Sequence, residues 1–330
     1  MTRRAVKQLS NADVVEEVLL VVDKQLRTNR QGGQYLHLEL RDKTGSIGAR
    51  LWNVPDHLAN AFDSGDYLRV QGKTQLFQGS LQLILSRIDP VDSSSIDPSE
   101  YLPEAPANLG HLTSRLRAIL LDIGDPHLRA LAECFLIDDA FMAKFTAAPA
   151  GIRNHHAYRG GLLEHVVTMM EAALKIAPLY PELNRDILLV GILLHDVGKI
   201  DELSYDRTFG YTDEGQLVGH IIIGVEILRD KVEKTADLTG EPFPREMLLR
   251  LKHMITSHHG PAEFGSPKLP MTPEAIALHY LDNLDAKLHV FIREIRDDPA
   301  RDATWTPFHA NLNRRIFKGG GPSSPTEDDA

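Results

Sequence analysis

Hydrophobic and polar residues alternate along the first 90 positions with the period of two that half-buried β-strands show. In the clearest case, residues 35–40, leucines at every second position alternate with tyrosine, histidine and glutamate. Similar short runs, separated by turn residues, predict further strands and one helical patch between the third and the fourth. The predicted strands span residues 14–22, 35–40, 47–52, 67–72 and 81–85, and the helix spans residues 55–62.

The pattern changes to helical spacing from residue 109 onwards. Leu112, Leu116 and Ile119 recur at intervals of three to four residues, as do Leu128 and Leu131 further along. This spacing is typical of amphipathic helices that pack against one another. Strand signals are scarce up to residue 317, so this part of the chain is predicted to be all-α.

Two segments lack either pattern. Residues 91–108 contain three prolines and a run of serines, which predicts a semi-stiff linker. Residues 319–330 are rich in glycine, serine, proline and acidic residues, and we predict that they are disordered. The chain is therefore expected to hold an all-β domain over residues 1–90 and an all-α domain over residues 109–318.

Five strands with a helix between the third and the fourth follow the order of an OB-fold barrel. The runs over residues 36–52 and 65–72 resemble those of nucleic-acid-binding OB modules. This region offers aromatic and cationic side chains, the mixture that stacks on bases and neutralises the backbone of a single strand. Alternatively, the aromatic rings fill the ends of a small barrel, and OB folds also bind sugars and proteins. The candidates for binding a strand are Tyr35, Arg50, Trp52, Arg69, Lys73 and Phe77.

The composition is that of a soluble globular protein, with 330 residues of which 42% are hydrophobic and 25% charged. The single cysteine, Cys134, excludes an internal disulfide framework and favours a reducing compartment. No signal peptide and no apolar run of about 20 residues is visible, so we expect a cytoplasmic protein that does not span a membrane. A net charge of −10 argues against a general nucleic-acid coat protein.

An apolar run over residues 187–194 ends in the dipeptide His195-Asp196, which predicts a buried helix that carries two metal-type ligands into a core. Such a dipeptide also arises by chance, and a lone histidine beside an apolar face is more often a core residue than a ligand. Imidazole and carboxylate together suit a first-row transition metal. Several unpaired polar groups aimed at one core would be costly, and a shared cation removes that cost. The other candidates lie on helix-like segments and are His165, His220, His258, His259 and Asp282.

The order of these residues resembles the H…HD…D signature of the HD-domain metal-dependent phosphohydrolases, matched here by His165, His195, Asp196 and Asp282. The additional histidines, His220 and His258 or His259, match the subset of that family that holds two metals. The resemblance therefore implies two divalent ions, one bound by His165, His195, Asp196 and Asp282, the other by Asp196, His220 and His258, with His259 as an alternative or supporting ligand.

An OB module ahead of an HD domain narrows the resemblance. Residues 10–318 as a whole resemble the YhaM family of 3′→5′ exoribonucleases, including the runs HHAYRGGLLEH (residues 155–165) and TSHHG (residues 256–260). The resemblance implies a metal-dependent enzyme that hydrolyses single-stranded RNA, and also single-stranded DNA, from the 3′ end to nucleoside 5′-monophosphates. The OB domain would grip the strand while the HD domain cuts it.

The implied chemistry assigns roles to further residues. Asp196 would bridge the two ions at the catalytic centre, and Lys199, one helical turn later, would act as a point charge on the scissile phosphate, unless it is a solvated lysine at a helix end. His156 and Arg159 precede a helix N-terminus and are candidates for binding the substrate phosphate. Mn²⁺ is the favoured ion, and Fe²⁺ or Co²⁺ suit the same ligands. Candidates for orienting the ligating histidines are Glu164, Glu226, Glu263 and Asp285.

Two other interpretations remain at this point. The first is an HD-domain phosphohydrolase of a nucleotide or a cyclic dinucleotide, in which the OB domain regulates or tethers. The second is a non-enzymatic OB nucleic-acid binder whose helical domain keeps a metal for structure, although a structural site tends to be closed by protein ligands and to lack a spare cation such as Lys199. The sequence leaves open the choice between RNA and DNA and the oligomeric state.

Overall fold

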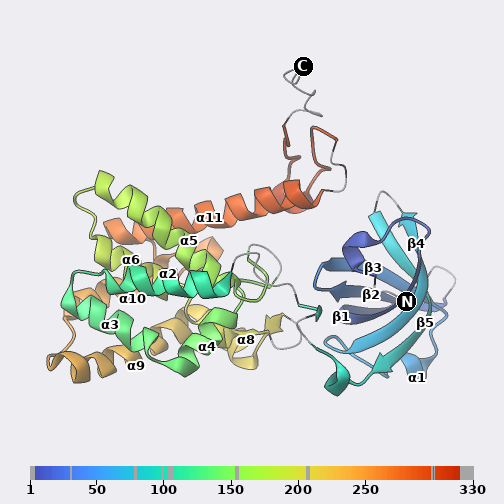
Figure 1. Ribbon diagram of the computed structural model, residues 1–330, viewed down its shortest axis with the longest axis horizontal. Helices are drawn as coiled ribbons and strands as arrows, with labels where there is room; N and C mark the ends of the chain where they lie inside the picture. Colours follow the sequence, from blue (N-terminus) through green and yellow to red (C-terminus); the bar gives the residue numbers. More distant parts are fainter. Residues whose placement is uncertain are drawn as a thin grey trace, which may run out of the picture.

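The structure is a computed structural model that describes residues 4–29, 32–77, 80–97, 100–102, 108–152, 156–205, 209–298, 300 and 302–319. Figure 1 shows a β-barrel formed by the N-terminal part of the chain and a bundle of helices formed by the rest. This confirms the predicted order of a small all-β unit followed by an all-α unit. The predicted linker lies partly, and the predicted disordered tail almost wholly, outside the described residues.

The barrel is closed by five strands in the order β1-β2-β3-β5-β4, with β3 and β5 parallel and the other pairs antiparallel. Alternation decides which side chains face inward: Leu36, Leu38 and Leu40 are fully buried, whereas Tyr35 and His37 point outward. The short helix α1 lies between β3 and β4, as the OB-fold order requires. The bounds are β1 Val14–Thr28, β2 Gln34–Asp42, β3 Gly45–Trp52, α1 Asp56–Ala59, β4 Tyr67–Phe77 and β5 Ser80–Val91.

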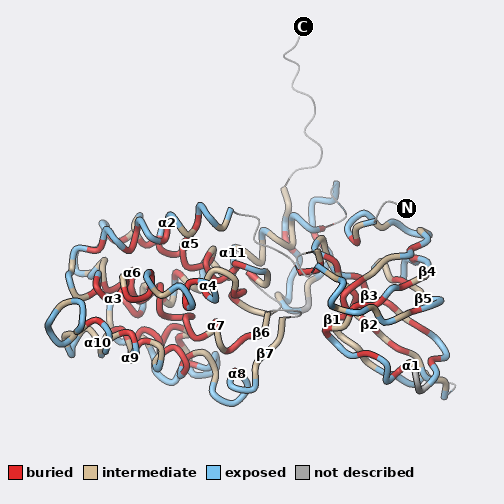
Figure 2. The backbone as a smooth tube through the Cα atoms, turned by 60° about the horizontal axis from the view of Figure 1, so that its bottom comes forward, coloured by how far each residue is buried: buried red, intermediate tan, exposed pale blue. Residues whose placement is uncertain are grey.

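The helical unit packs around α6, whose residues 187–194 are all buried (Figure 2). A helix that is apolar on every side belongs in the middle of a bundle, and α3, α5, α10 and α11 all contact α6. The helices are α2 Leu109–Leu121, α3 Pro126–Leu136, α4 Asp139–Ala147, α5 Gly161–Ile176, α6 Arg185–Leu194, α7 Lys199–Glu202, α8 Asp213–Leu217, α9 His220–Thr239, α10 Arg245–Ser257 and α11 Pro273–Asp297.

The helical unit also contains extended structure that the helical pattern does not predict. Two short strands, β6 Leu203–Ser204 and β7 Gly210–Tyr211, form a hairpin beside α8. After α11, residues 302–319 fold back on themselves through isolated β-bridges between Trp305 and Phe317 and between His309 and Arg314. We refer to residues 302–319 as the C-terminal segment.

In the part of the chain that the structure describes, the barrel and the helical unit touch through a small apolar cluster and an ion pair. Phe209 of the helical unit packs against the cluster that contains Tyr67 of β4 and Tyr101. Lys7 Nζ lies 3.7 Å from Asp297 Oδ1 at the end of α11. The last turn of α11 therefore approaches the barrel, as Figure 1 shows. Among the described residues, no helix is both long and apolar enough to cross a membrane.

Candidate metal centre and nucleic-acid interface

The predicted ligands converge at the ends and along the sides of five helices. His195 caps the C-terminus of α6 and Asp196 follows it, so the buried helix delivers both to the floor of the centre. His165 comes from the first half of α5, His220 is the first residue of α9, and Asp282 lies in α11. His258 and His259 follow the last residue of α10.

One oxygen of Asp196 faces the first group of ligands. Asp196 Oδ2 lies 3.3 Å from His195 Nε2 and 3.9 Å from His165 Nε2. His165 Nε2 in turn lies 3.4 Å from Asp282 Oδ1 and 3.3 Å from His195 Nε2. The ligand atoms of His165, His195 and Asp282 all lie within 4.8 Å of one another, close enough to share one ion.

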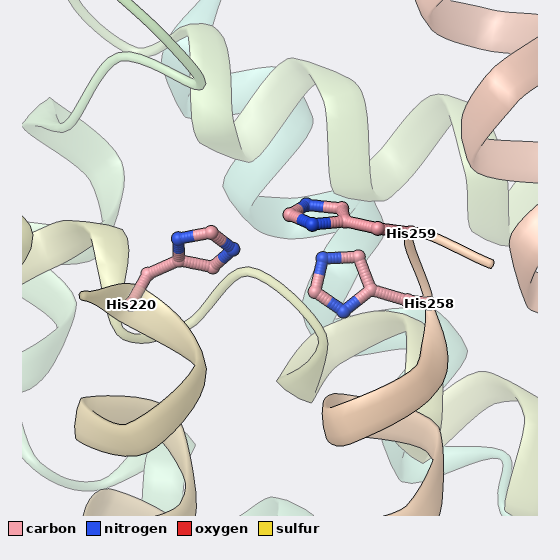
Figure 3. Close-up of side chains that lie close together, drawn as sticks. All are labelled: His220, His258 and His259. Atoms are coloured by element: carbon pink, nitrogen blue, oxygen red, sulfur yellow. The ribbon is translucent and has the colours of Figure 1, made fainter. Parts of the chain in front are cut away.

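The other oxygen of Asp196 faces the second group. Asp196 Oδ1 lies 3.6 Å from His220 Nε2 and 3.6 Å from His258 Nε2. Figure 3 shows His220 reaching across from α9 towards His258 and His259 at the end of α10. The ligand atoms of these three histidines also lie within 4.8 Å of one another. Both adjacent histidines therefore remain candidates, of which His258 is buried and His259 is half-buried.

Hydrogen bonds orient four of these histidines in the same way. Each ring places Nδ1 against a carbonyl or carboxylate oxygen, which accepts the Nδ1 proton and directs Nε2 towards the centre. Such partners fix the tautomer and the ring orientation that metal coordination needs. The four pairs are His165 with Asp285 (2.7 Å), His195 with the Ile192 carbonyl (2.8 Å), His220 with Glu202 (2.9 Å) and His258 with the Ile255 carbonyl (2.8 Å).

The centre also contains buried polar atoms that lack a protein partner. Asp196 Oδ1, His220 Nε2 and His258 Nε2 are inaccessible and form no hydrogen bond within the described residues. Leaving a buried donor or acceptor unpaired costs about 1–3 kcal/mol each. A cation between these three atoms would satisfy them together, so the residues present fit a divalent metal.

Opposing electrostatic effects act on the ligands. Burial tends to raise the pKa of the Asp196 carboxyl, but the charge of Lys199 and the contact with the His195 ring outweigh it and hold that pKa well below the usual range. Burial tends to lower the pKa of His165, but hydrogen bonds to Asp282 and Asp285 raise it to about 9. Asp196 is thus ionised, and a proton occupies His165 until a stronger cation displaces it.

A glycine two residues after Asp196 allows α9 to approach the centre. A Cβ atom on Gly198 would lie 2.1 Å from the carbonyl oxygen of His220, which no real contact allows. The close approach of the Gly198 backbone to the start of α9 brings the His220 ring within reach of Asp196. The residues after the His-Asp pair therefore help to position a ligand from elsewhere in the chain.

Three further residues of the helical unit, predicted to contact the substrate phosphate, lie in three different environments. Lys199 Nζ donates to Asp196 Oδ2 at 2.6 Å and to the Ala150 carbonyl at 2.7 Å, so it lies at the edge of the centre. His156 is buried behind His165, with Nε2 2.9 Å from Asp285 Oδ2, and does not face the open side. Arg159 lines a separate pocket of about 450 Å³, together with residues of α4 and α7.

A large cleft opens from the metal centre. It has a volume of about 920 Å³ and begins at Asp196, Lys199 and His258. From there it follows α11 past Lys287 to the C-terminal segment. It therefore provides room beside the centre for molecules much larger than a water or a phosphate ion.

The barrel gathers most of its predicted strand-binding residues on one outer face. The rings of Tyr35 and Trp52 lie 4.7 Å apart, and the guanidinium of Arg50 lies 5.4 Å from the centre of the Phe77 ring. Trp52 and Phe77 are 42% and 44% exposed, so these rings do not fill the barrel. They offer flat surfaces on which bases stack.

The two remaining cations lie on β4. Lys73 pairs with Ile84 of β5, and Ile84 pairs with Arg50 of β3. Lys73 and Arg50 therefore lie in the same row across the outer surface of the barrel. Arg69 lies four residues earlier and faces Asp89 on β5. We call the face formed by Tyr35, Arg50, Trp52, Lys73 and Phe77 the OB face; Arg69 is also exposed, further along β4.

Comparisons with known proteins agree with both halves of the chain. The HD domain family matches residues 162–287, and the OB-fold nucleic acid binding domain family matches residues 20–91. The 3′-5′ exoribonuclease YhaM of Geobacillus sp. (strain WCH70) is 37% identical over 92% of this chain and 91% of its own length. The chain belongs to the YhaM family of 3′-5′ exoribonucleases. The YhaM protein of Bacillus subtilis (strain 168) is 36% identical over 92% of this chain and 94% of its own length.

Asp285 and Glu202 each orient a metal ligand in this YhaM family member, but the sequence predicts only the first. Asp285 is one of four carboxylates that were candidates for orienting a histidine, and among the described residues it is the one of the four that contacts a ligand. Glu202, which holds His220, was not predicted. It lies in the four-residue helix α7, whose length is too short to produce a periodic signal.

Proposed function

We propose that this chain is a metal-dependent 3′→5′ exoribonuclease that hydrolyses single-stranded RNA to nucleoside 5′-monophosphates. The observation that carries the proposal is the position of Asp196, whose two carboxylate oxygens face two separate groups of ligands. A carboxylate in that position is suited to bridge two divalent ions. Membership of the YhaM family gives the direction of attack and the substrate class.

The chain supplies ligands, orientation and charge. When bound, two divalent ions would lower the pKa of a water molecule and stabilise charge on the phosphate in the transition state. His165, His195, Asp196 and Asp282 would hold one of them, and Asp196, His220 and His258 the other. Lys199 holds the Asp196 carboxylate and adds positive charge at the inner end of the cleft.

The chemistry of the side chains indicates both the metal ion and the nucleic acid that the protein binds. Imidazole-rich sites with carboxylates suit Mn²⁺, Fe²⁺ or Co²⁺, and which of these ions occupies the site depends on its availability. We propose Mn²⁺ as the working ion. The OB face offers stacking surfaces and cations that recognise a single strand without reading its sequence. A cytoplasmic location agrees with a single cysteine, Cys134, that is buried and unpaired.

The test uses RNA oligomers labelled at either end and incubated with the protein and Mn²⁺. We expect the 3′ label to be released first as a mononucleotide, while the 5′ label moves down a ladder one nucleotide at a time. Asp196→Ala should abolish the ladder and retain binding of RNA to the OB face. Loss of neither label from the wild-type protein would reject the proposal, and release of the 5′ label first would reject the direction. A DNA oligomer of the same sequence compares the two sugars.

One alternative has a distinct outcome in the same assay. A phosphohydrolase of small nucleotides would use the same metal centre, but it would not need the OB face. It would turn over a nucleotide or a cyclic dinucleotide while leaving the labelled oligomers intact. The length of the cleft favours an oligomer over a mononucleotide.

A further inference from the structure

The cleft is longer than the metal centre requires. It begins at Asp282 and still contains Arg293, eleven residues later on the same helix. At a rise of about 1.5 Å per residue, that stretch of α11 is about 16 Å long. A stacked strand rises about 3.4 Å per nucleotide, so the cleft has room for about four to five nucleotides.

The lining of the cleft beyond the metal centre has the chemistry of a strand-binding surface. Lys287 is exposed, and no carboxylate of the described residues lies within ion-pairing distance of its ammonium group. Asn283, one turn before it, and Asn311, across the cleft, add amide groups that can donate to phosphate or base oxygens. Phe264 and Leu312 provide apolar surface for bases.

The far wall of the cleft is a fixed structure built by the C-terminal segment. Lys318 Nζ binds Asp298 Oδ2 at 2.6 Å and so ties the end of the segment to the end of α11. His309 Nδ1 lies 3.2 Å from Glu294 Oε2 on α11, which holds the middle of the segment against the helix. Ile316 is buried beneath it. Asn311 and Leu312 are therefore held facing α11.

The cleft runs from the metal centre towards the barrel. It starts at the metal centre and follows α11 towards the helix end that approaches the barrel through the contact between Lys7 and Asp297. A strand whose last nucleotide lies at the metal centre would leave along α11 in the direction of the barrel. Its upstream nucleotides would then pass Lys287 and Asn311.

We propose that α11 and the C-terminal segment form a channel that binds about three nucleotides on the 5′ side of the scissile bond. In this channel Lys287 contacts a backbone phosphate and Asn311 contacts the strand from the opposite wall. The inference rests on the proposed exoribonuclease function and adds the site that holds the substrate between the metal centre and the OB face.

The experiment compares substrates that reach into the channel with one that does not. For the wild-type protein with Mn²⁺, kcat/KM should rise with each added nucleotide from a dinucleoside monophosphate and level off once the channel is full. Lys287→Ala should lower kcat/KM for a long oligomer by about tenfold or more, because a hydrogen bond to a charged group is lost. It should leave hydrolysis of the dinucleoside monophosphate within about twofold. Lys234→Ala, an exposed lysine on α9 outside the cleft, is the matched control.

A binding measurement keeps the test independent of hydrolysis. With EDTA present, the anisotropy of a labelled single-stranded RNA oligomer gives its affinity at several salt concentrations. Lys287→Ala should reduce the slope of log K against log salt by about 0.7, the value for one phosphate contact in a single strand. Asn311→Asp should weaken binding by charge repulsion, whereas Asn313→Asp, outside the cleft, should not.

The outcomes separate the channel from the proposed function. Equal losses on the dinucleoside monophosphate and the long oligomer, or an unchanged salt slope in Lys287→Ala, would overturn the channel while leaving the exoribonuclease intact. A wild-type protein that binds the oligomer with the predicted dependence on Lys287 but cuts no RNA would retain the channel and reject the nuclease.

Discussion

The carboxylate of Asp285 accepts a hydrogen bond from Nδ1 of His165 at 2.7 Å, directly behind the metal centre. The same oxygen lies 2.9 Å from Nε2 of His156, whose Nδ1 lies 2.8 Å from the hydroxyl of Tyr158. That hydroxyl donates to Glu164 at 2.8 Å. Asp285 thus joins His165 to a row of hydrogen-bonding groups that runs through His156 and Tyr158 to Glu164. His156 therefore supports a metal ligand from behind.

Asp285→Asn should weaken the ion held by His165. The amide is a poorer acceptor than the carboxylate, and loss of such a supporting partner typically costs 10- to 100-fold in metal affinity or activity. We expect the Mn²⁺ concentration that gives half-maximal RNA hydrolysis to rise by about that factor, with activity restored at high Mn²⁺. Glu226→Gln, an exposed carboxylate on α9, should leave the Mn²⁺ dependence unchanged. The same Mn²⁺ dependence in Asp285→Asn and wild type would contradict this role.

Glu202→Ala should empty one metal site and spare the other. Glu202 Oε1 accepts hydrogen bonds from both the backbone N–H and Nδ1 of His220, at 3.0 and 2.9 Å. Without it, His220 loses the partner that aims Nε2 at Asp196. Elemental analysis should find about one ion per chain instead of about two. Glu233→Ala, exposed on α9, is the control, and two ions per chain in Glu202→Ala would refute the assignment.

The contrast between Asp285 and Glu202 explains what the sequence could predict. The predicted ligands lie on long helices with clear periodicity or at their ends, so helical spacing, the His195-Asp196 pair and the resemblance to the HD-domain phosphohydrolases single them out as candidates. Asp285 lies one turn after Asp282 on a predicted helix and was within reach of the same reasoning. Glu202 meets His220 only because the chain turns through the β6–β7 hairpin, a path that no local pattern encodes.

The substrate side of the site was harder to predict for a related reason. Residues 302–319 have no helical or strand period, and their wall of the cleft depends on tertiary contacts such as that between Lys318 and Asp298. Arg159 was assigned to the phosphate from its place before a helix N-terminus, but the structure directs it into a different pocket. In the barrel, by contrast, a period of two was enough to place Tyr35 and Arg50 on the outer surface.

Lys199→Ala should reduce both activity and the stability of the metal-free protein. Lys199 and Asp196 form a buried ion pair, and removing one partner of such a pair costs about 3–5 kcal/mol. Mn²⁺ would compensate the Asp196 charge, so the loss should be largest in EDTA. Loss of one charge that stabilises the transition state should also lower kcat by about 100-fold.

Urea unfolding in EDTA and in Mn²⁺, together with kcat for a long RNA oligomer, measures both effects. Lys175→Ala, an exposed lysine on α5, serves as the control. A free energy of unfolding that falls equally in EDTA and in Mn²⁺ would mean that the ion does not replace the charge of Lys199.

Trp52→Ala should lower the affinity for long RNA strands without changing the rate of hydrolysis at the metal centre. The exposed indole of Trp52 packs 4.7 Å from the Tyr35 ring, and a stacked base is worth about 1–3 kcal/mol. We expect KM for a long RNA oligomer to rise about 5- to 150-fold, with kcat for a dinucleoside monophosphate unchanged. Tyr180→Ala, an exposed aromatic residue of the helical unit, should change neither value. A fall in kcat on the short substrate would show that Trp52 supports folding instead of binding.

His289 should make the folded protein less stable in mild acid. Burial and the neighbouring His156 lower the pKa of His289 from 6.5 to about 4. Between about pH 6.5 and pH 4 the imidazole of His289 is protonated in the unfolded chain but neutral in the folded protein. The free energy of unfolding therefore decreases as the pH falls through this range. Because His289 is only half-buried, we expect a loss on the order of 1 kcal/mol at pH 5.

His289→Phe should remove this contribution while keeping a ring beside His156, whose own ring centre lies 4.0 Å away. The measurement is the free energy of unfolding in urea at about pH 7.5 and about pH 5, in EDTA so that metal release does not contribute. The difference between the two pH values should be smaller in His289→Phe than in the wild type. His111→Gln, an exposed histidine on α2, should retain the wild-type difference. If His289→Phe also retains the wild-type difference between the two pH values, the acid sensitivity arises from other groups. Phenylalanine cannot take up a proton, so the contribution of His289 would be absent from that variant.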